Sequence, residues 1–359
     1  MKIKQLHIQN YKSLVDFKLE NLPAFAAVVG PNASGKSNIF EALEFTNYVC
    51  RFPFEATSFF GGLKNIYSYQ ATPGKKMSFY YKFDNDININ FSLGITPQRN
   101  LDGFEDVYSI GQEPILDLGK EENPFLFLDI RDKNKRDNFL EVVRQKHLTY
   151  NNEFEIFIDN FSRLLVGKTF LNRSFQLQSR LHTNASNLSQ ILAQILDSEK
   201  KDDFFEWLRI LIPEFRDIEI RKSNIDGSSE FFLYEMTSTR PFSRHLISDG
   251  TFNILSLMAA VFQNENPQFL CIEEPEYGLH PQAIELLVNF LREKSEEKGH
   301  HILLNTHSQT LVRCLEPHEI ILVNKVNGAT IAKQLTADNA VNIKTDEAWL
   351  SNAFGGGVL

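Results

Sequence analysis

The sequence predicts an α/β fold, in which a mixed or parallel sheet is flanked by helices and carries an antiparallel β-subdomain and a compact helical insertion. Two short apolar runs, residues 24–29 and 269–272, are typical of strands buried on both faces. Each run is followed by a turn and then by apolar residues at helical spacing. Because these runs lie far apart in the chain, we expect the two ends of the chain to build one domain.

The N-terminal segment is expected to form a strand, a glycine-rich loop and a helix. Residues 3–9 alternate apolar and polar side chains, as on a half-buried strand, and residues 24–29 then form the first fully buried strand. Gly30 follows directly, and apolar residues recur at helical spacing from residue 39. Toward the other end, residues 269–272, 282–298 and 301–304 predict a second strand–helix–strand unit.

The middle of the chain changes pattern twice. Residues 77–95 alternate as in one or two antiparallel strands, with a turn at residues 83–86. Residues from about 120 to 215 show helical patterns without sustained heptads, and residues 217–236 predict a hairpin around Asp226 and Gly227. We therefore expect a main domain built from residues 1–120 and 216–359, with a helical insertion at residues 121–215.

The composition is that of an ordinary globular protein. Of the 359 residues, 42% are hydrophobic and 23% are charged, and 31 phenylalanines supply large apolar surface for a core. The net charge of −9 argues against a generally basic surface, so any contact with DNA would need a local patch.

Neither metal-binding cysteines nor targeting segments are evident. Cys50, Cys271 and Cys314 form no CxxC or Cys/His cluster, which favours reduced thiols. The N-terminus has no apolar signal region, and no run approaches the about 18 apolar residues of a membrane span. We therefore expect a cytoplasmic protein without a membrane partner.

A phosphate-binding loop is predicted between the first buried strand and its helix. The motif GxxxxGK[ST] is matched by Gly30, Pro31, Asn32, Ala33, Ser34, Gly35, Lys36 and Ser37. Backbone N–H groups of such a loop face the phosphates of ATP, the lysine neutralises the β and γ oxygens, and the hydroxyl of Ser37 ligates Mg²⁺. The alternative, a glycine-rich turn with a chance Lys-Ser pair, is disfavoured by the position between strand and helix.

Two acids follow the second buried strand. Glu273 is expected to hold Mg²⁺, directly or through water, and Glu274 to polarise the attacking water. The alternative is a pair of solvated glutamates at the end of a strand. Because the metal-side position is more often aspartate, the longer side chain of Glu273 could weaken or rearrange magnesium binding.

Three further motifs resemble those of one family. Residues 247–251 resemble the ABC signature motif, residues 273–281 resemble the Walker B and D-loop segment, and residues 305–308 resemble the switch-histidine segment. The motifs and their order along the chain resemble those of ABC-type ATPases in the branch that contains SMC, RecF and OLD (overcoming lysogenization defect) proteins. Within this branch, the resemblance is greatest to OLD-like ATPases of bacterial antiviral defence. The resemblance covers residues 1–50 and 240–325 and implies a P-loop NTPase with an ABC-type head.

The resemblance implies a homodimer that encloses two ATP molecules. Ser248 and Gly250 would contact the γ-phosphate bound to the other subunit, and His307 would sense the γ-phosphate. Ser248 precedes an expected helix, so a plain helix N-cap is the alternative for it. A structural histidine is the alternative for His307.

Other residues have weaker assignments. Asn32 and Asn38 are expected to assist in positioning nucleotide or water, Lys12 to lie near the nucleotide, and His280 to be an interface residue. Two glutamines, Gln70 and Gln98, are candidates for the Q-loop, and their contexts do not decide between them.

The resemblance also bears on partners. OLD-type relatives carry a Toprim nuclease domain after the ATPase, whereas this chain ends soon after the His307 segment, so we expect a separately encoded effector, which could be a nuclease. The leading hypothesis is an ATP-driven dimeric switch for that effector. The alternatives are a nucleotide-gated scaffold with little turnover and a RecF-like, DNA-binding repair ATPase.

Overall fold

The fold is described from a computed structural model. It describes residues 3–51, 56–71, 75–83, 88–93, 95–99, 106–110, 115–116, 126–127, 157, 159–165, 180–222, 229–339, 344–351 and 353–354. Within these residues no helix is both long and apolar enough to cross a membrane.

A six-stranded sheet forms the centre of the molecule, in the order β10-β14-β15-β3-β16-β17. The first five strands are parallel, and β17 pairs antiparallel with β16 at the edge. β3, β14 and β15 are buried at every position, as the continuous apolar runs predict. The strands span β3 Phe25–Val29, β10 Phe161–Leu165, β14 Phe269–Glu273, β15 His301–Thr306, β16 Ile320–Val326 and β17 Ala329–Gln334.

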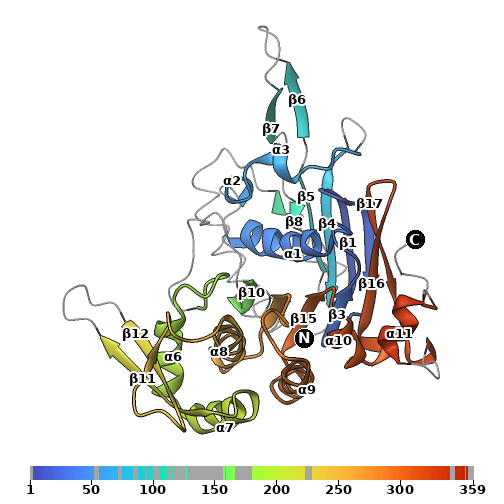
Figure 1. The fold of residues 1–359 in the computed structure, drawn as a ribbon. Coiled ribbons are helices and arrows are strands. Elements are labelled where there is room, and N and C mark those ends of the chain that lie inside the picture. The colour runs from blue at the N-terminus through green and yellow to red at the C-terminus, as the bar shows by residue number, and fades with distance from the viewer. Residues whose placement is uncertain are drawn as a thin grey trace.

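Helices and a second sheet cover the two faces of the central sheet (Figure 1). One face packs against α8 and α9, and the other packs against α1 and the four-stranded antiparallel sheet β2-β1-β4-β5. Side chains of one strand alternate between these two cores, with Ala27 in the first and Ala26 in the second. The bounds are α1 Lys36–Arg51, α8 Asp249–Phe262, α9 Pro281–Lys298, β1 Ile3–Tyr11, β2 Leu14–Glu20, β4 Met77–Phe83 and β5 Asn88–Leu93.

The predicted α/β fold with an antiparallel β-subdomain is therefore confirmed. β4 and β5 pair antiparallel within the alternating segment, and the expected turn between them lies mostly outside the described residues. The predicted hairpin is formed by β11 Phe215–Lys222 and β12 Ser229–Glu235, with β13 Phe242–Ser243 added to it, and its expected turn at Asp226 and Gly227 also lies outside the described residues.

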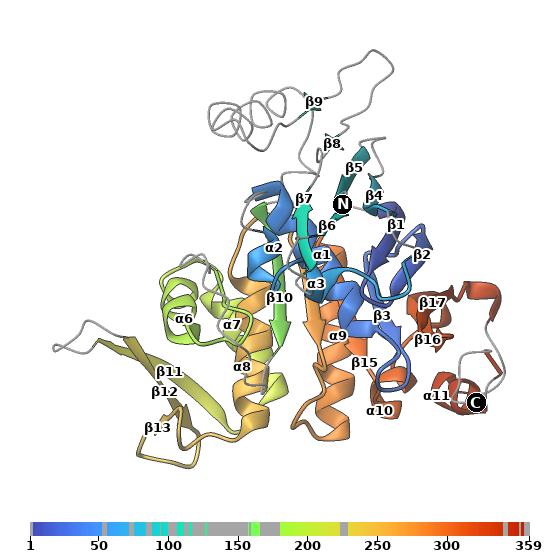
Figure 2. The ribbon, with the colours of Figure 1, turned by 90° about the horizontal axis from the view of Figure 1, so that it is seen from above.

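The segment expected to be a helical insertion contains helices that pack on the core. α6 Leu188–Leu196 and α7 Lys201–Leu211 lie beside α8 (Figure 2), and both bury an apolar face in the core that they share with it. The helical pattern at residues 128–147 lies outside the described residues. The same segment also supplies β10, an edge strand of the central sheet, which the sequence analysis did not predict. Ser162 and Arg163 interrupt the apolar run of this strand, which explains why its pattern was not recognised.

Shorter elements complete the description. The β16–β17 hairpin beside the glycine-rich loop was also not predicted. The remaining elements are α2 Ala56–Phe59, α3 Leu63–Ile66, β6 Ile95–Arg99, β7 Asp106–Ile110, β8 Ile115–Leu116, β9 Leu126–Phe127, α10 Gln309–Arg313, η1 Pro317–Glu319, η2 Ala337–Asn339 and α11 Thr345–Leu350.

Candidate functional site

The glycine-rich loop leads from β3 into the first turn of α1, as the motif predicts. Gly35 has φ +100° and Ala33 has φ +64°, so the loop bends sharply around its own backbone. The first N–H groups of a helix have no partner within the helix, and they carry the positive end of its dipole. The loop and the start of α1 thus form a cradle of backbone donors suited to phosphate.

The two motif glycines at the ends of the loop are required by close packing against β16 and β17. A β-carbon at Gly30 would lie 2.1 Å from the carbonyl oxygen of Val323, and one at Gly35 would lie 2.0 Å from Oγ1 of Thr330. Thr330 in turn donates a hydrogen bond to the carbonyl of Ser34 at 3.0 Å. The unpredicted hairpin therefore supports the loop from behind.

Lys36 lies across the loop. Its Nζ donates to the carbonyl oxygens of Gly30 and Pro31, both at 2.8 Å, and the residue is 8% exposed. These contacts fix the ammonium group inside the curve of the loop, where it can neutralise phosphate oxygens.

Glu273 meets the loop at the carboxyl edge of the sheet. Oγ of Ser37 donates to Oε2 of Glu273 at 2.7 Å, although the residues are 236 positions apart in the chain. Nδ2 of Asn305, in the neighbouring strand β15, lies 3.2 Å from the same oxygen and 3.3 Å from Oγ of Ser37. The structure thus brings together the two residues that the sequence analysis expected to hold magnesium.

This oxygen donor set fits Mg²⁺. Magnesium prefers hard oxygen ligands and is usually held by one or two protein groups together with phosphates and water. The hydroxyl of Ser37 and the carboxylate of Glu273 are such groups, next to the phosphate cradle. No cluster of three or more His, Cys, Asp or Glu residues that could hold a metal occurs among the described residues.

Arg163 is a residue at this site that the sequence analysis missed. Its Nε donates to Oε1 of Glu273 at 2.7 Å, and its Nη1 donates to Oε2 of Glu44 at 2.7 Å. Burial lowers the pKa of Arg163, but the carboxylates of Glu44 and Glu273 outweigh this effect and raise the pKa, so the guanidinium stays charged. Only a fold that places β10 beside β14 could reveal this contact, because Arg163 belongs to no motif.

Glu274 and Glu276 lie in the turn after β14. The backbone N–H of Glu274, at φ +49°, donates to the carbonyl of Asn305 at 2.8 Å. Oε1 of Glu276 accepts a 2.5 Å hydrogen bond from Thr306, whereas its buried Oε2 has no partner in the described part of the chain. Burial raises the pKa of Glu276 despite the hydrogen bond from Thr306, which favours a neutral carboxylic acid.

The signature-like segment forms the start of α8. Ser248 is exposed and caps the helix, since its Oγ accepts from the N–H of Thr251 at 3.1 Å. A β-carbon at Gly250 would lie only 2.3 Å from the carbonyl oxygen of Gly278. Asn253, one turn further along, donates to the carbonyls of Pro275 and Tyr277, both at 2.9 Å. The start of α8 is thus locked to the D-loop segment.

No hydrogen bond in the described part of the chain joins Ser248 or Gly250 to the glycine-rich loop of the same chain. Ser248 does act as an N-cap, as the alternative interpretation holds, but its exposure leaves the hydroxyl open to a further contact. His307 is likewise exposed, directly after Thr306 at the carboxyl end of β15.

The residues with weaker assignments have defined neighbours. Nδ2 of Asn38 donates to Oγ of Ser13 at 2.7 Å, and Lys12 forms an ion pair with Glu41 on α1. Nδ1 of His280 caps α9 by accepting from the N–H of Gln282 at 3.3 Å. Asn32 lies within the loop. Nε2 of Gln70 donates to the carbonyl of Asn327 in the β16–β17 turn, and the side chain of Gln98 lies outside the described residues.

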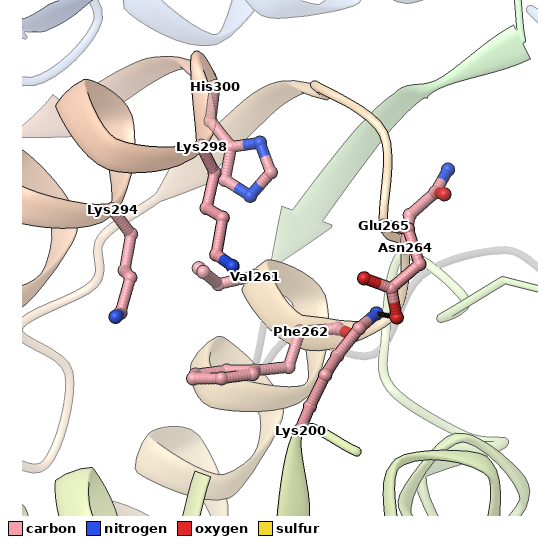
Figure 3. Close-up of a pocket in the computed structure, with 8 residues that line it drawn as sticks. All are labelled: Lys200, Val261, Phe262, Asn264, Glu265, Lys294, Lys298 and His300. Atoms are coloured by element: carbon pink, nitrogen blue, oxygen red, sulfur yellow. Dashed lines mark hydrogen bonds and ion pairs between the residues drawn. The ribbon is translucent and has the colours of Figure 1, made fainter. Parts of the chain in front are cut away.

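A small pocket lies at the opposite edge of the sheet (Figure 3). Two of its lysines are already paired, because Lys200 bridges to Glu265 at 2.8 Å and Lys294 to Asp203 at 3.2 Å. Burial lowers the pKa of His300 in its wall to about 4, so this ring is neutral. The pocket adjoins the amino ends of β14 and β15 and contributes nothing to the phosphate site.

The fold and the site together define a class of protein. A parallel sheet with a glycine-rich loop after one strand, acids at the end of another strand and an antiparallel β-subdomain is a P-loop NTPase with an ABC-type head. Residues 25–313 match the family described as "AAA domain, putative AbiEii toxin, Type IV TA system". This match covers well over half of the chain, so the chain belongs to that family.

Two curated relatives match the sequence. An "ATP/GTP phosphatase" of Helicobacter pylori is 20% identical over 337 residues, which cover 88% of this chain and 87% of that protein. The "Chromosome partition protein Smc" of Methanocaldococcus jannaschii is 27% identical over 113 residues, which are 31% of this chain but only 10% of that protein.

Solved structures of SMC heads share the fold. The "SMC head domain from Thermotoga maritima" aligns with a TM-score of 0.50 at 16% identity, covering 94% of this chain and all of that one (100%). An SmcHead bound to the C-winged helix domain of ScpA aligns with a TM-score of 0.57 at 14% identity, covering 95% and 99% of the two chains. These similarities confirm the expected ABC-type head.

Proposed function

We propose that the protein is a Mg²⁺-dependent ATPase. The observation that carries this proposal is the 2.7 Å contact between Ser37, at the end of the glycine-rich loop, and Glu273, at the end of β14. It joins a phosphate cradle to a carboxylate at the position where a nucleotide-bound magnesium ion needs oxygen ligands. The similarity to the ATP/GTP phosphatase supports the same reaction.

The chain's own residues have distinct roles in this proposal. The loop residues Gly30–Asn38 bind the phosphates, and Lys36 neutralises the charge that develops during γ-phosphate transfer. Ser37 and Glu273 would hold Mg²⁺, which supplies further charge stabilisation when bound. Glu274 orients and polarises the attacking water, from a turn fixed to Asn305.

A second copy of the chain completes the site. Ser248 and Gly250 are the residues through which one subunit contacts the γ-phosphate held by its partner, and His307 senses the γ-phosphate. The exposure of Ser248 supports this arrangement, because its hydroxyl can reach a ligand outside its own fold, and the exposure of His307 leaves its ring open to a phosphate. So does the lock between α8 and the D-loop segment, since it makes the contacting surface rigid before the subunits meet.

The biological setting of this ATPase is a switch for a separately encoded effector in bacterial defence. The family description, with its reference to a toxin of a type IV toxin–antitoxin system, supports that setting. The solved SmcHead–ScpA complex supports the general idea that heads of this fold hold a partner protein. A nuclease effector, a contact with DNA and the location in the cytoplasm stay predictions.

The test is ATP turnover at several protein concentrations, with mass from light scattering in the presence and absence of Mg²⁺–ATP. Turnover per subunit should rise with concentration, and Lys36→Ala, Ser248→Arg and Glu274→Gln should each abolish it. Glu274→Gln should also accumulate an ATP-dependent dimer. Concentration-independent turnover that survives Ser248→Arg would show that one chain completes its own site.

A nucleotide-gated scaffold with little turnover is the second candidate. It is favoured by one observation, namely that both oxygens of Glu273 already accept hydrogen bonds, from Arg163, Ser37 and Asn305. A metal ion at Oε2 must compete with the hydrogen bonds from Ser37 and Asn305, which lowers its affinity for the site. The scaffold predicts that Glu274→Gln leaves effector function intact, whereas the ATPase switch predicts its loss.

A further inference from the structure

Arg163 lies on the face of the sheet that carries the proposed magnesium ligand. It pairs in register with Cys271 of β14, and Glu273 follows two residues later on the same face. Alternate side chains of a strand share a face, so Arg163 and Glu273 both face α1. Glu44 of α1 approaches the guanidinium from the other side.

The two carboxylate oxygens of Glu273 have different hydrogen-bond partners. Nε and Nη2 of Arg163 both donate to Oε1, with the Nε contact at 2.7 Å. Oε2 is left to face Ser37 at 2.7 Å and Asn305 at 3.2 Å. The side chains of Arg163 and Glu273 are 6% and 2% exposed, so water cannot replace these contacts.

A glutamate needs such support more than an aspartate does. Its additional methylene adds a rotatable bond, which lets the carboxylate take several positions relative to the loop. A planar guanidinium that binds one carboxylate oxygen through two N–H groups removes that freedom, which a lysine cannot do as well. The buried cluster of one arginine and two glutamates also keeps a negative charge for a divalent cation.

We propose that Arg163 is the positioning residue of the magnesium site, which holds Oε1 of Glu273 and thereby presents Oε2 beside Ser37. This arrangement allows glutamate to serve where aspartate is more common. The inference deepens the proposed Mg²⁺–ATP function and rests on it. Arg163 is expected to act only through Glu273, without touching nucleotide or metal.

The probe is Mn²⁺, whose binding to the protein with a non-hydrolysable ATP analogue is followed by electron paramagnetic resonance. Arg163→Met should weaken Mn²⁺ binding about 10- to 100-fold, the usual range for residues that orient a metal ligand. Arg163→Lys should fall between this variant and the wild type. Binding of the analogue in EDTA should stay within about twofold of wild type, because the loop itself is unchanged.

Two further variants separate positioning from charge and from stability. Arg163→Met/Glu44→Gln restores the net charge of the cluster but not the hold on Glu273, so Mn²⁺ binding should stay weak. It also removes one of the two buried carboxylates that lose the guanidinium in Arg163→Met, which keeps the test open if the single variant fails to fold. Arg292→Met breaks a comparable arginine pair with Glu319, far from the site, and should leave Mn²⁺ binding unchanged.

The possible outcomes separate the inference from the function on which it rests. Absence of Mn²⁺–analogue binding to the wild type overturns the proposed function and, with it, the inference. Wild-type binding with unchanged Mn²⁺ affinity in folded Arg163→Lys and Arg163→Met/Glu44→Gln overturns the positioning role alone. Recovery of affinity in the double variant also overturns it, because Mn²⁺ binding would then need no arginine on Oε1 of Glu273.

Discussion

Gly250→Ala should separate ATP binding from ATP hydrolysis. A β-carbon at Gly250 would lie 2.3 Å from the carbonyl oxygen of Gly278, well inside ordinary contact distance. The D-loop segment and the start of α8 must therefore move apart by about 1 Å, and overpacking of this kind costs about 1–3 kcal/mol of folding free energy. A displacement of this size in the surface that we propose fits a second subunit can lower turnover about 100-fold.

The assay combines steady-state ATP turnover with ATP binding to the isolated subunit. The cradle for the phosphates is built by the loop before α1, so the affinity of the subunit for ATP should remain near that of the wild type. Gly62→Ala is the matched control for stability: its φ of +87° makes alanine strained, but a β-carbon there would meet nothing within 4 Å. Both variants should be destabilised, and only Gly250→Ala should lose turnover. Normal turnover by Gly250→Ala would refute the proposed role of the α8–D-loop lock.

Three other substitutions test separate contacts. Asn253→Ala leaves two carbonyls of the D-loop segment without their donor. Urea denaturation should therefore show that the free energy of unfolding is lower by about 2–4 kcal/mol. A loss below about 1 kcal/mol would mean that water replaces both hydrogen bonds. Thr330→Val keeps the shape of the side chain but loses the hydrogen bond to the carbonyl of Ser34. Calorimetry should therefore find that ATP binding is weakened several-fold. An unchanged affinity for ATP would contradict the idea that β17 supports the loop. Glu276→Gln mimics the neutral acid. Burial raises the pKa of Glu276 in the folded protein above its ordinary value of 4.5. The neutral carboxyl group therefore contributes to the stability of the wild type below pH 4.5, and this contribution is lost as the pH rises through the pKa of the folded state. The melting temperature of the variant relative to wild type should therefore increase from pH 5 to pH 8, and a constant difference would show that the carboxyl group is ionised throughout.

Much of the fold could be predicted because its strands are buried on both faces. Continuous apolar runs identified β3, β14 and β15, and alternation identified β1 and the β4–β5 pair. β10 escaped because Arg163 and Ser162 break its apolar run, and an arginine in a buried strand is tolerated only where partners neutralise it. Those partners, Glu44 and Glu273, come from other elements and leave no local signal.

The candidate site, like the fold, could be predicted from the sequence only in part. The spacing of the loop motif predicted Lys36 and Ser37 as site residues, and the acids at the end of the second buried strand predicted Glu273, because each motif carries its chemistry within a few residues. The backbone cradle depends mainly on local conformation, so a short sequence is sufficient to specify it.

The sequence by itself determined the class of fold and the chemical character of the site. Only the tertiary structure decided how Glu273 meets Ser37, which arginine holds that acid, and how Gly250 packs on Gly278. The physical reason is that these contacts join segments more than 25, and up to 236, residues apart, and their formation depends on strand order and register in the central sheet. Neither property is encoded in the neighbourhood of any single motif.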